Sequence, residues 1–212
     1  MTALSWDQSI RSFIAQLAST SPAPGGGSVA ALAASLGTAI TVMVGNFTQD
    51  ERFVHVQPQI DEVMERMQLL CAECEDLFAS DIISFETYLA ALKLPHHTEE
   101  EKAFRKQAVQ LGAINAIDVP IRLMEVCKTG MVYASSIAEV SNCHVASDLG
   151  IGVILLEAAA QSALLTIDIN LPALHDLELK QQYFDKAEAL RIEIAALKSN
   201  TLTTVRNRMT QL

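Results

Sequence analysis

One carboxylate interrupts an otherwise apolar row of side chains. Between residues 60 and 92, ten positions follow one another at alternating steps of four and three, the spacing of a seam between packed helices. Nine of the ten are apolar or aromatic, and the exception is Asp81. An ionised carboxylate without a partner is costly among apolar groups, so Asp81 is expected to be paired, protonated or next to a wet pocket. The ten positions are Ile60, Met64, Met67, Cys71, Cys74, Phe78, Asp81, Phe85, Tyr88 and Leu92.

Two roles are compatible with such a residue. Burial raises the pKa of a carboxyl group toward the range in which it can exchange protons near neutral pH, which suits a general acid–base catalyst. A buried polar residue can instead fix the register of packed helices. The periodicity alone does not choose between these two roles for Asp81.

Three consecutive glycines at positions 25–27 form a second candidate site. With the next three residues they spell the dinucleotide-binding pattern GxGxxA, but that pattern needs a preceding strand, which Pro22 and Pro24 exclude. No Gly-Lys-Ser/Thr sequence follows to make a P-loop. Glycine lets a ligand approach the backbone, and a helix N-terminus offers free N–H groups to an anion. Because three glycines exceed what a turn requires, a ligand-contacting loop is favoured over a plain connection.

Further polar side chains gather around a later apolar segment, residues 151–167. Ser141, Asn142, Ser147 and Asp148 precede it, and Asn170 follows it. These groups could cap helices or donate hydrogen bonds to a ligand held between helices. Capping is the favoured role of Ser147 or Asp148 taken alone.

The cysteines and histidines do not predict a metal site. Cys71 and Cys74 form a CxxC pair, but zinc needs four ligands and a redox CxxC needs a neighbouring βαβ pattern. Both cysteines belong to the apolar seam, so core packing is favoured. Adjacent residues such as His96 and His97 point apart on a helix. We therefore expect no metal.

Start and stop signals divide the chain into helices. Capping boxes at residues 5–8 and 98–101 predict two helix starts, and Pro58 suits the first turn of the long helix that carries the seam. The helix that begins near residue 98 is expected to run toward Pro120, with a further helix after this proline.

Two segments are apolar all round. Residues 28–47 include no charged side chain, and residues 151–167 are interrupted only by Glu157 and Gln161. The first segment is long enough to span a bilayer, yet it is rich in Ala, Gly, Ser and Thr, and nothing basic lies just before it. Small residues at positions 33, 37, 41 and 45 let another helix approach, so a buried central helix is favoured over a membrane span.

Composition sets the class of the protein. The 212 residues are 50% hydrophobic and 19% charged with a formal charge of −10, which excludes intrinsic disorder and argues against sequence-independent nucleic-acid binding. The start does not read as a secretory signal, and four cysteines form no disulfide framework, so a cytoplasmic setting is expected. We predict an all-α fold, one domain over residues 1–212. It is a helical bundle with long amphipathic helices around two apolar central helices.

Several motifs, kept in order, together resemble a known family. They are SPAPGGGSVAAL, MVGNFT, DIISFETY, LP followed by TEEEKAFR, VASD and INL. In this combination the chain is similar to the formimidoyltetrahydrofolate cyclodeaminase and methenyltetrahydrofolate cyclohydrolase family, over roughly residues 5–179. The resemblance implies an all-helical, dimeric, cytoplasmic protein that binds a folate near the glycine loop, with no cofactor besides this substrate.

The resemblance also assigns residues. Asp81 matches the family's proposed acid–base aspartate, and Arg105 matches a basic residue that could meet the glutamate carboxylates of folate. The sequence departs from the family pattern at His96, Ser141 and Thr166, which bears on substrate preference more than on fold. The residues that match substrate-binding stretches are Pro24, Gly25, Gly26, Gly27 and Ser28 in the loop, and Asn142, Ser147 and Asp148 in the second polar stretch.

The implied function is hydrolysis of 5,10-methenyltetrahydrofolate to 10-formyltetrahydrofolate by carboxylate acid–base catalysis. Hydrolysis is preferred because no transferase domain accompanies the sequence. The alternatives are a formimidoyltetrahydrofolate cyclodeaminase that releases ammonia, and a non-catalytic folate-binding or scaffold protein. We expect a folate partner and a homodimer, without nucleic acid or membrane.

Overall fold

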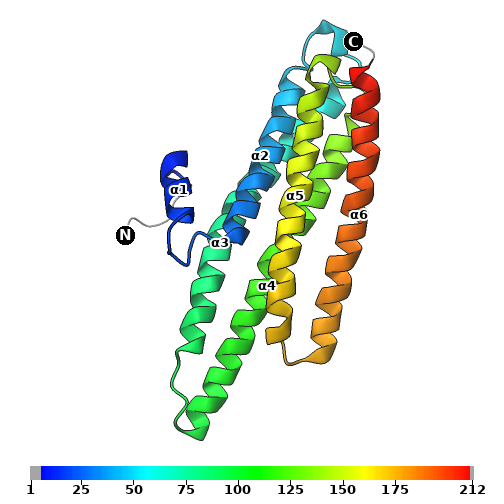
Figure 1. Cartoon of the computed structure of the whole chain (residues 1–212). Helices are drawn as coiled ribbons and strands as arrows, with labels where there is room; N and C mark the ends of the chain where they lie inside the picture. Colours follow the sequence, from blue (N-terminus) through cyan, green and yellow to red (C-terminus); the bar gives the residue numbers. More distant parts are fainter. Residues whose placement is uncertain (1–5, 211–212) are drawn as a thin grey trace.

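The structure, a computed structural model, describes residues 6–210. This part of the chain contains six α-helices, three short 3₁₀ turns and no strand, which confirms the predicted all-α bundle. Five long helices pack side by side, and the short α1 stands beside them (Figure 1). The helices are α1 (Ile10–Leu17), α2 (Gly26–Asn46), α3 (Gln57–Leu92), α4 (Glu99–Ser136), α5 (Ala146–Asn170) and α6 (Leu177–Met209), and the 3₁₀ turns are η1 (Glu51–Phe53), η2 (Cys143–Val145) and η3 (Leu171–Ala173).

α2 and α5 form the centre of the bundle, as predicted for the two apolar segments. α2 packs between α3 and α5, and α5 also packs against α4 and α6. At the crossing of α2 and α5, a Cβ atom added to Gly37 would come within 2.9 Å of the carbonyl oxygen of Gly152. No side chain fits there, so these two glycines allow the backbones to approach closely.

Both central helices pass a simple test for membrane spans. By length and composition, α2 and the stretch Cys143–Ala173 could each cross a membrane. The most apolar 18-residue segment of α2 is 50% buried inside the protein, and that of Cys143–Ala173 is 44% buried. An apolar helix at the centre of a bundle has the same character. Their packing against α3, α4 and α6 supports the central-helix interpretation.

The first helix begins later than the predicted capping box. Ser9 is its N-cap, and the Ser9 hydroxyl accepts a hydrogen bond from the N–H of Ser12 at 3.1 Å. Residue 5 of the predicted box lies outside the described residues. Trp6 precedes the helix and packs edge-on against Phe78 of α3, with ring centroids 5.3 Å apart. This tertiary contact of Trp6 competes with the local helix signal, so the predicted start was wrong.

The predicted break at Pro120 was also wrong, because α4 continues through this residue. A proline inside a helix has no N–H to donate to the carbonyl group four residues earlier, which here belongs to Ala116. The side-chain amide of Asn170 donates to that carbonyl oxygen instead, at 3.3 Å. The side chain of another helix end therefore compensates for the missing backbone hydrogen bond.

Two other helix starts, those of α3 and α4, are confirmed. α3 begins at Gln57 with Pro58 in its first turn. At the start of α4, the Thr98 hydroxyl accepts a hydrogen bond from the N–H of Glu101. In return, the Glu101 carboxylate accepts one from the N–H of Thr98. Both signals are local, and the structure follows them.

The apolar seam of α3 is buried along its first part and emerges near its end. Cys74 and Phe78 are buried, whereas Phe85 and Leu92 are 38% and 39% exposed. Burial raises the pKa of the Cys74 thiol to about 12, as expected of a cysteine that packs in the core. Among the described residues, no group of three or more His, Cys, Asp or Glu side chains is placed to hold a metal.

Candidate active site

Asp81 lies where α3 passes the N-terminus of α2. The hydroxyl of Ser28 donates a hydrogen bond to Asp81 Oδ2 at 2.8 Å, although the two residues are 53 positions apart in sequence. Ser28 is fully buried and Asp81 is half-buried. The N-cap residue of α2, Gly25, has no side chain to cap the helix. Because a carboxylate is favourable beside the free N–H groups of a helix N-terminus, Asp81 supplies from α3 the negative group that this helix start lacks.

Gly27 is required by the position of this carboxyl group. A Cβ atom at Gly27 would lie 2.0 Å from Asp81 Oδ1 and 2.5 Å from Asp81 Cγ, far inside contact distance. A Cβ atom at Gly26 would meet nothing within 4 Å, and one at Gly25 would meet only the carbonyl oxygen of Pro22, at 4.0 Å. The third glycine thus makes room for Asp81, while the first two leave their backbone open.

The environment of Asp81 raises the pKa of its carboxyl group. Burial raises the pKa of Asp81 above its ordinary value, because it removes the charged form from water. Hydrogen bonds from the hydroxyl and the backbone N–H of Ser28 oppose this effect and are smaller. No charged side chain of the described residues contributes to the shift. Asp81 is therefore not locked in an ion pair, and it can both accept and release a proton.

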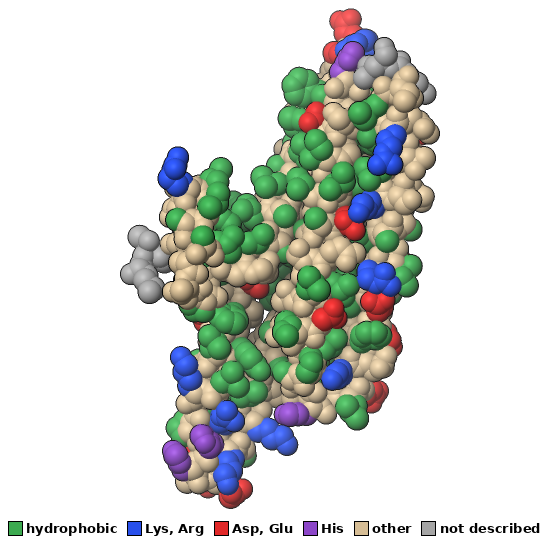
Figure 2. Space-filling view, viewed as in Figure 1, with side chains coloured by type: hydrophobic (Ala, Val, Ile, Leu, Met, Phe, Trp, Pro, Cys, Tyr) green, Lys and Arg blue, Asp and Glu red, His purple; other side chains and the backbone are tan. Residues whose placement is uncertain are grey.

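The surface next to this site is hollow. Figure 2 shows a hollow between α1 and the bundle with apolar side chains on both sides, and α2 begins at this level (Figure 1). A small cavity of about 100 Å³ lies at the contact of α1 with the bundle. The cavity is lined by Trp6, Gln8, Ile10, Phe13, Leu32 and Phe78.

Two residues near the site were not predicted from the sequence. Trp6 and Phe13 both pack on Phe78, one helical turn before Asp81, with ring centroids 5.3 and 5.9 Å away. Helical spacing could not have identified them, since it carries no information about a partner on another helix.

Arg105 belongs to α4 and contacts the C-terminal end of α3. Its Nε and Nη2 atoms donate to the carbonyl oxygen of Leu92, at 3.3 and 3.1 Å. Leu92 is the last residue of α3, eleven residues after Asp81 and roughly 16 Å along the helix axis. Arg105 therefore binds the C-terminus of α3 and does not contact Asp81 directly.

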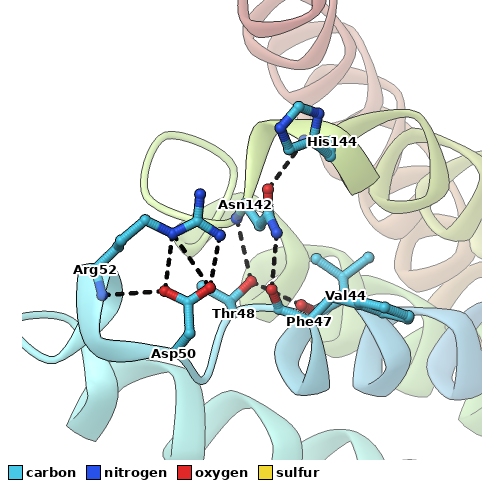
Figure 3. Close-up of polar contacts among 7 residues, drawn as sticks. All are labelled: Val44, Phe47, Thr48, Asp50, Arg52, Asn142 and His144. Carbon is cyan, nitrogen blue, oxygen red and sulfur yellow. Dashed lines mark hydrogen bonds and ion pairs between the residues drawn. The ribbon is translucent and has the colours of Figure 1, made fainter.

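Asn142 lies at the other end of α2. Its backbone N–H donates to the hydroxyl of Thr48 (3.1 Å), and its side-chain amide donates to the carbonyl of Phe47 (2.9 Å). Its side-chain oxygen accepts a hydrogen bond from the N–H of His144, so that Asn142 caps η2 (Figure 3). These contacts tie η2 to the C-terminus of α2, roughly 30 Å from the turn that holds Asp81.

Ser147 and Asp148 lie beside this far end. α5 begins at Ala146 with Val145 as its N-cap, so the prediction that Ser147 or Asp148 is the cap was wrong. Both belong to the first turn of α5, where the charge of Asp148 is favourable to the helix dipole. The structure thus brings Asp81 together with Gly27 and Ser28 in the first turn of α2, and leaves the second polar stretch distant from it.

Comparisons with known proteins agree with this architecture. The family model described as formiminotransferase-cyclodeaminase matches residues 9–189. A methenyltetrahydrofolate cyclohydrolase from Methylorubrum extorquens is 32% identical over 204 residues, which cover 96% of this chain and 98% of that protein. A formimidoyltransferase-cyclodeaminase from Rattus norvegicus is 33% identical over 83% of this chain, which spans 33% of its length. The crystal structure of a formiminotetrahydrofolate cyclodeaminase from Thermotoga maritima has the same fold, with a TM-score of 0.86 over 95% of this chain and 97% of that one, at 24% identity.

Proposed function

Because the chain belongs to the formiminotransferase-cyclodeaminase family, we propose that it is a folate one-carbon enzyme that hydrolyses 5,10-methenyltetrahydrofolate to 10-formyltetrahydrofolate. The relative that is matched over 98% of its length is named a cyclohydrolase, which supports hydrolysis as the reaction. The observation that carries the chemistry is Asp81, a half-buried carboxyl group with a raised pKa and no charged partner among the described residues, held against the glycine loop.

The reaction needs one group that moves a proton twice. Water attacks the methenyl carbon and forms the new C–O bond, while the Asp81 carboxylate takes a proton from that water. The resulting tetrahedral carbon carries OH between N5 and N10. Asp81 then gives its proton to N5 as the C–N5 bond breaks, and the carbinol O–H proton leaves to solvent as the formyl C=O forms. A single carboxyl group with a raised pKa suits both transfers, and when ionised it also stabilises the methenyl cation.

Cyclodeamination is the second candidate. The relative from Rattus norvegicus is named for it, although this chain spans only a third of that protein. In this reaction N10 attacks a formimino carbon and ammonia leaves, so the tetrahedral carbon carries NH₂ in place of OH. Asp81 would take the proton from N10 and give it to the NH₂ group, which leaves as ammonia when its C–N bond breaks. The two reactions therefore make the same demand on the site.

A direct assay tests these functions. Methenyltetrahydrofolate absorbs in the near ultraviolet, and we expect the purified protein to accelerate the loss of this absorbance. A trace identical to that of buffer would exclude the hydrolase. Ammonia release from formimidoyltetrahydrofolate, measured in parallel, would then establish the deaminase. Binding of either folate without turnover would leave a folate-binding protein without catalytic activity.

The remaining site residues stay predictions. We propose that the open backbone of Gly25 and Gly26 contacts the folate, and that Arg105 lies within reach of its glutamate carboxylates. Asn142 and Asp148 are too far from Asp81 to touch the same reacting carbon within one chain. We also propose a cytoplasmic location, which the four free cysteines support.

We propose a homodimer that buries the outer faces of α2 and α5. Leu36 on α2 is 54% exposed, and Ile151 and Ile154 on α5 are 45% and 44% exposed. α2 has no charged residue, and apolar side chains gather where these adjacent helices reach the surface (Figure 2). A continuous apolar surface of this kind is typical of an interface, and a second copy around a two-fold axis offers a matching one.

A charge placed on this surface is expected to prevent association. Leu36→Glu should convert the dimer into a monomer, because the carboxylate would lose its water at the interface without gaining a partner. Leu69→Glu is the matched control, since Leu69 is 56% exposed and belongs to α3, which is not part of the proposed interface. The mass of each variant can be measured by size-exclusion chromatography with light scattering. A dimeric Leu36→Glu variant would place the interface elsewhere.

A further inference from the structure

The two carboxylate oxygens of Asp81 have different surroundings. Oδ2 accepts the hydrogen bond from the Ser28 hydroxyl at 2.8 Å. Oδ1 lies over the backbone of Gly27, where a Cβ atom would come within 2.0 Å of it, and it accepts no side-chain hydrogen bond from the described residues. The Ser28 hydroxyl therefore holds Oδ2, and Oδ1 packs against the backbone of Gly27.

The Ser28 hydroxyl is committed to this contact. Ser28 is fully buried, and it is the third residue of α2 after the N-cap Gly25. A hydroxyl has one proton to donate, and here it is donated to Asp81. Ser28 thus has no hydroxyl proton left for a substrate, in contrast to the substrate-binding role that the resemblance implies for it.

We propose that Ser28 is a positioning residue that holds Asp81 by Oδ2, so that Oδ1 is the oxygen that takes the proton from water and returns it to N5. Because Gly27 has no side chain, Oδ1 has room to lie against its backbone. This inference rests on the proposed function, since it specifies which atom of Asp81 performs the transfers. Without Ser28 the carboxyl group can rotate about its side-chain bonds, and fewer of its orientations suit proton transfer.

The hydroxyl also influences when Asp81 is ionised. Its hydrogen bond lowers the pKa of Asp81 against the larger, opposite effect of burial. Removal of the hydroxyl is therefore expected to raise this pKa further. Because the carboxylate is the form that accepts a proton from water, the acid limb of the rate profile should move to higher pH.

Charged groups on the surrounding helices do not account for the raised pKa of Asp81. α2 contributes none, and no charged side chain is among the causes of the raised pKa of Asp81. On α4, Asp118 accepts a hydrogen bond from the Tyr183 hydroxyl, and Arg122 pairs with Glu73 and Glu125. On α3 itself, Asp76 and Glu86 lie five residues before and five residues after Asp81.

The experiment compares Ser28→Ala with Ser35→Ala. Ser35 is a matched control because it lies two turns later on α2, is 6% exposed, and contacts Cys71 of α3 through its hydroxyl at 3.3 Å. For Ser28→Ala we expect kcat to fall about tenfold or more, the worth of a hydrogen bond to a charged group, with KM little changed and the acid limb at higher pH. Ser35→Ala should keep the wild-type profile, and Ser28→Thr, which retains the hydroxyl, should recover most of the loss.

A direct titration separates this inference from the proposed function. The pKa of Asp81 can be followed by NMR with ¹³C-labelled aspartate, assigned through Asp81→Asn. A Ser28→Ala variant with an unchanged pKa and an unchanged rate profile would overturn the role of Ser28 while the enzyme stayed active. An equal loss in Ser35→Ala would also overturn it, since general packing would then explain both effects. If the wild type turned over no folate, the proposed function would fail, and with it the assignment of Oδ1.

Discussion

Replacing Asp81 with asparagine is expected to lower kcat for methenyltetrahydrofolate hydrolysis by about 10²–10⁴, the usual contribution of general acid–base catalysis. The amide oxygen of asparagine can still accept the hydrogen bond of Ser28, so the first turn of α2 stays in place. The amide cannot accept and return a proton. The loss should therefore appear in kcat, and the folate should still bind. Initial rates from the near-ultraviolet absorbance measure it.

Asp76→Asn is the matched control for this variant. Asp76 is an exposed aspartate on the same helix, and its replacement removes the same charge without touching the site. We expect wild-type rates from Asp76→Asn. If Asp81→Asn were as active as Asp76→Asn, Asp81 would be a structural residue that joins α3 to α2, and another group would have to move the protons.

The stability of Asp81→Asn should be equal to or higher than that of the wild type near neutral pH. Burial raises the pKa of Asp81 in the folded state above its unfolded value. The wild type is therefore most favoured below the unfolded pKa, and this contribution is lost as the pH rises through the folded pKa. Asparagine has no such loss, so the melting temperature of the variant should depend less on pH. Thermal unfolding at several pH values measures this difference.

Replacing Gly27 with alanine is expected to have the second largest effect. The new Cβ atom would lie 2.0 Å from Asp81 Oδ1, so the carboxyl group must rotate away and lose its geometry toward Ser28. We expect a loss in kcat of about 10² or more, because the proton-transferring group would no longer be in position. The fold should tolerate the change, because the displaced group is the end of a side chain. Alanine also stabilises a helix by about 1 kcal/mol relative to glycine.

Gly26→Ala is the natural comparison. It lies one residue earlier, and its Cβ atom would meet nothing within 4 Å. Its kcat should stay close to that of the wild type, with any effect confined to KM if the folate contacts this part of the loop. Steady-state kinetics and thermal unfolding of both variants separate the two glycines. Equal losses of kcat in both would mean that the loop needs its glycines for the ligand, and that room for Asp81 is not the reason.

Much of the fold could be predicted because its signals are local. The capping box of Thr98 and Glu101 joins residues three positions apart, and the proline in the first turn of α3 acts on its own backbone. The apolar seam follows from alternating steps of four and three residues, and the central helix α2 follows from the absence of charge in its sequence. Such features depend on residues that are close in sequence, so they stabilise a helix without contacts to distant parts of the chain. The sequence also singled out Asp81, because a carboxylate in an apolar seam requires a special environment.

The tertiary structure decided what that environment is. The partner of Asp81 is Ser28, 53 positions away, and the missing donor of Pro120 is replaced by Asn170, 54 positions from Ala116. Asn142, expected near the substrate, binds the far end of α2 instead. Each of these contacts depends on which helices lie side by side and in which direction they run. Periodicity identifies the face of a helix that is buried, but only the packed bundle determines which groups that face meets.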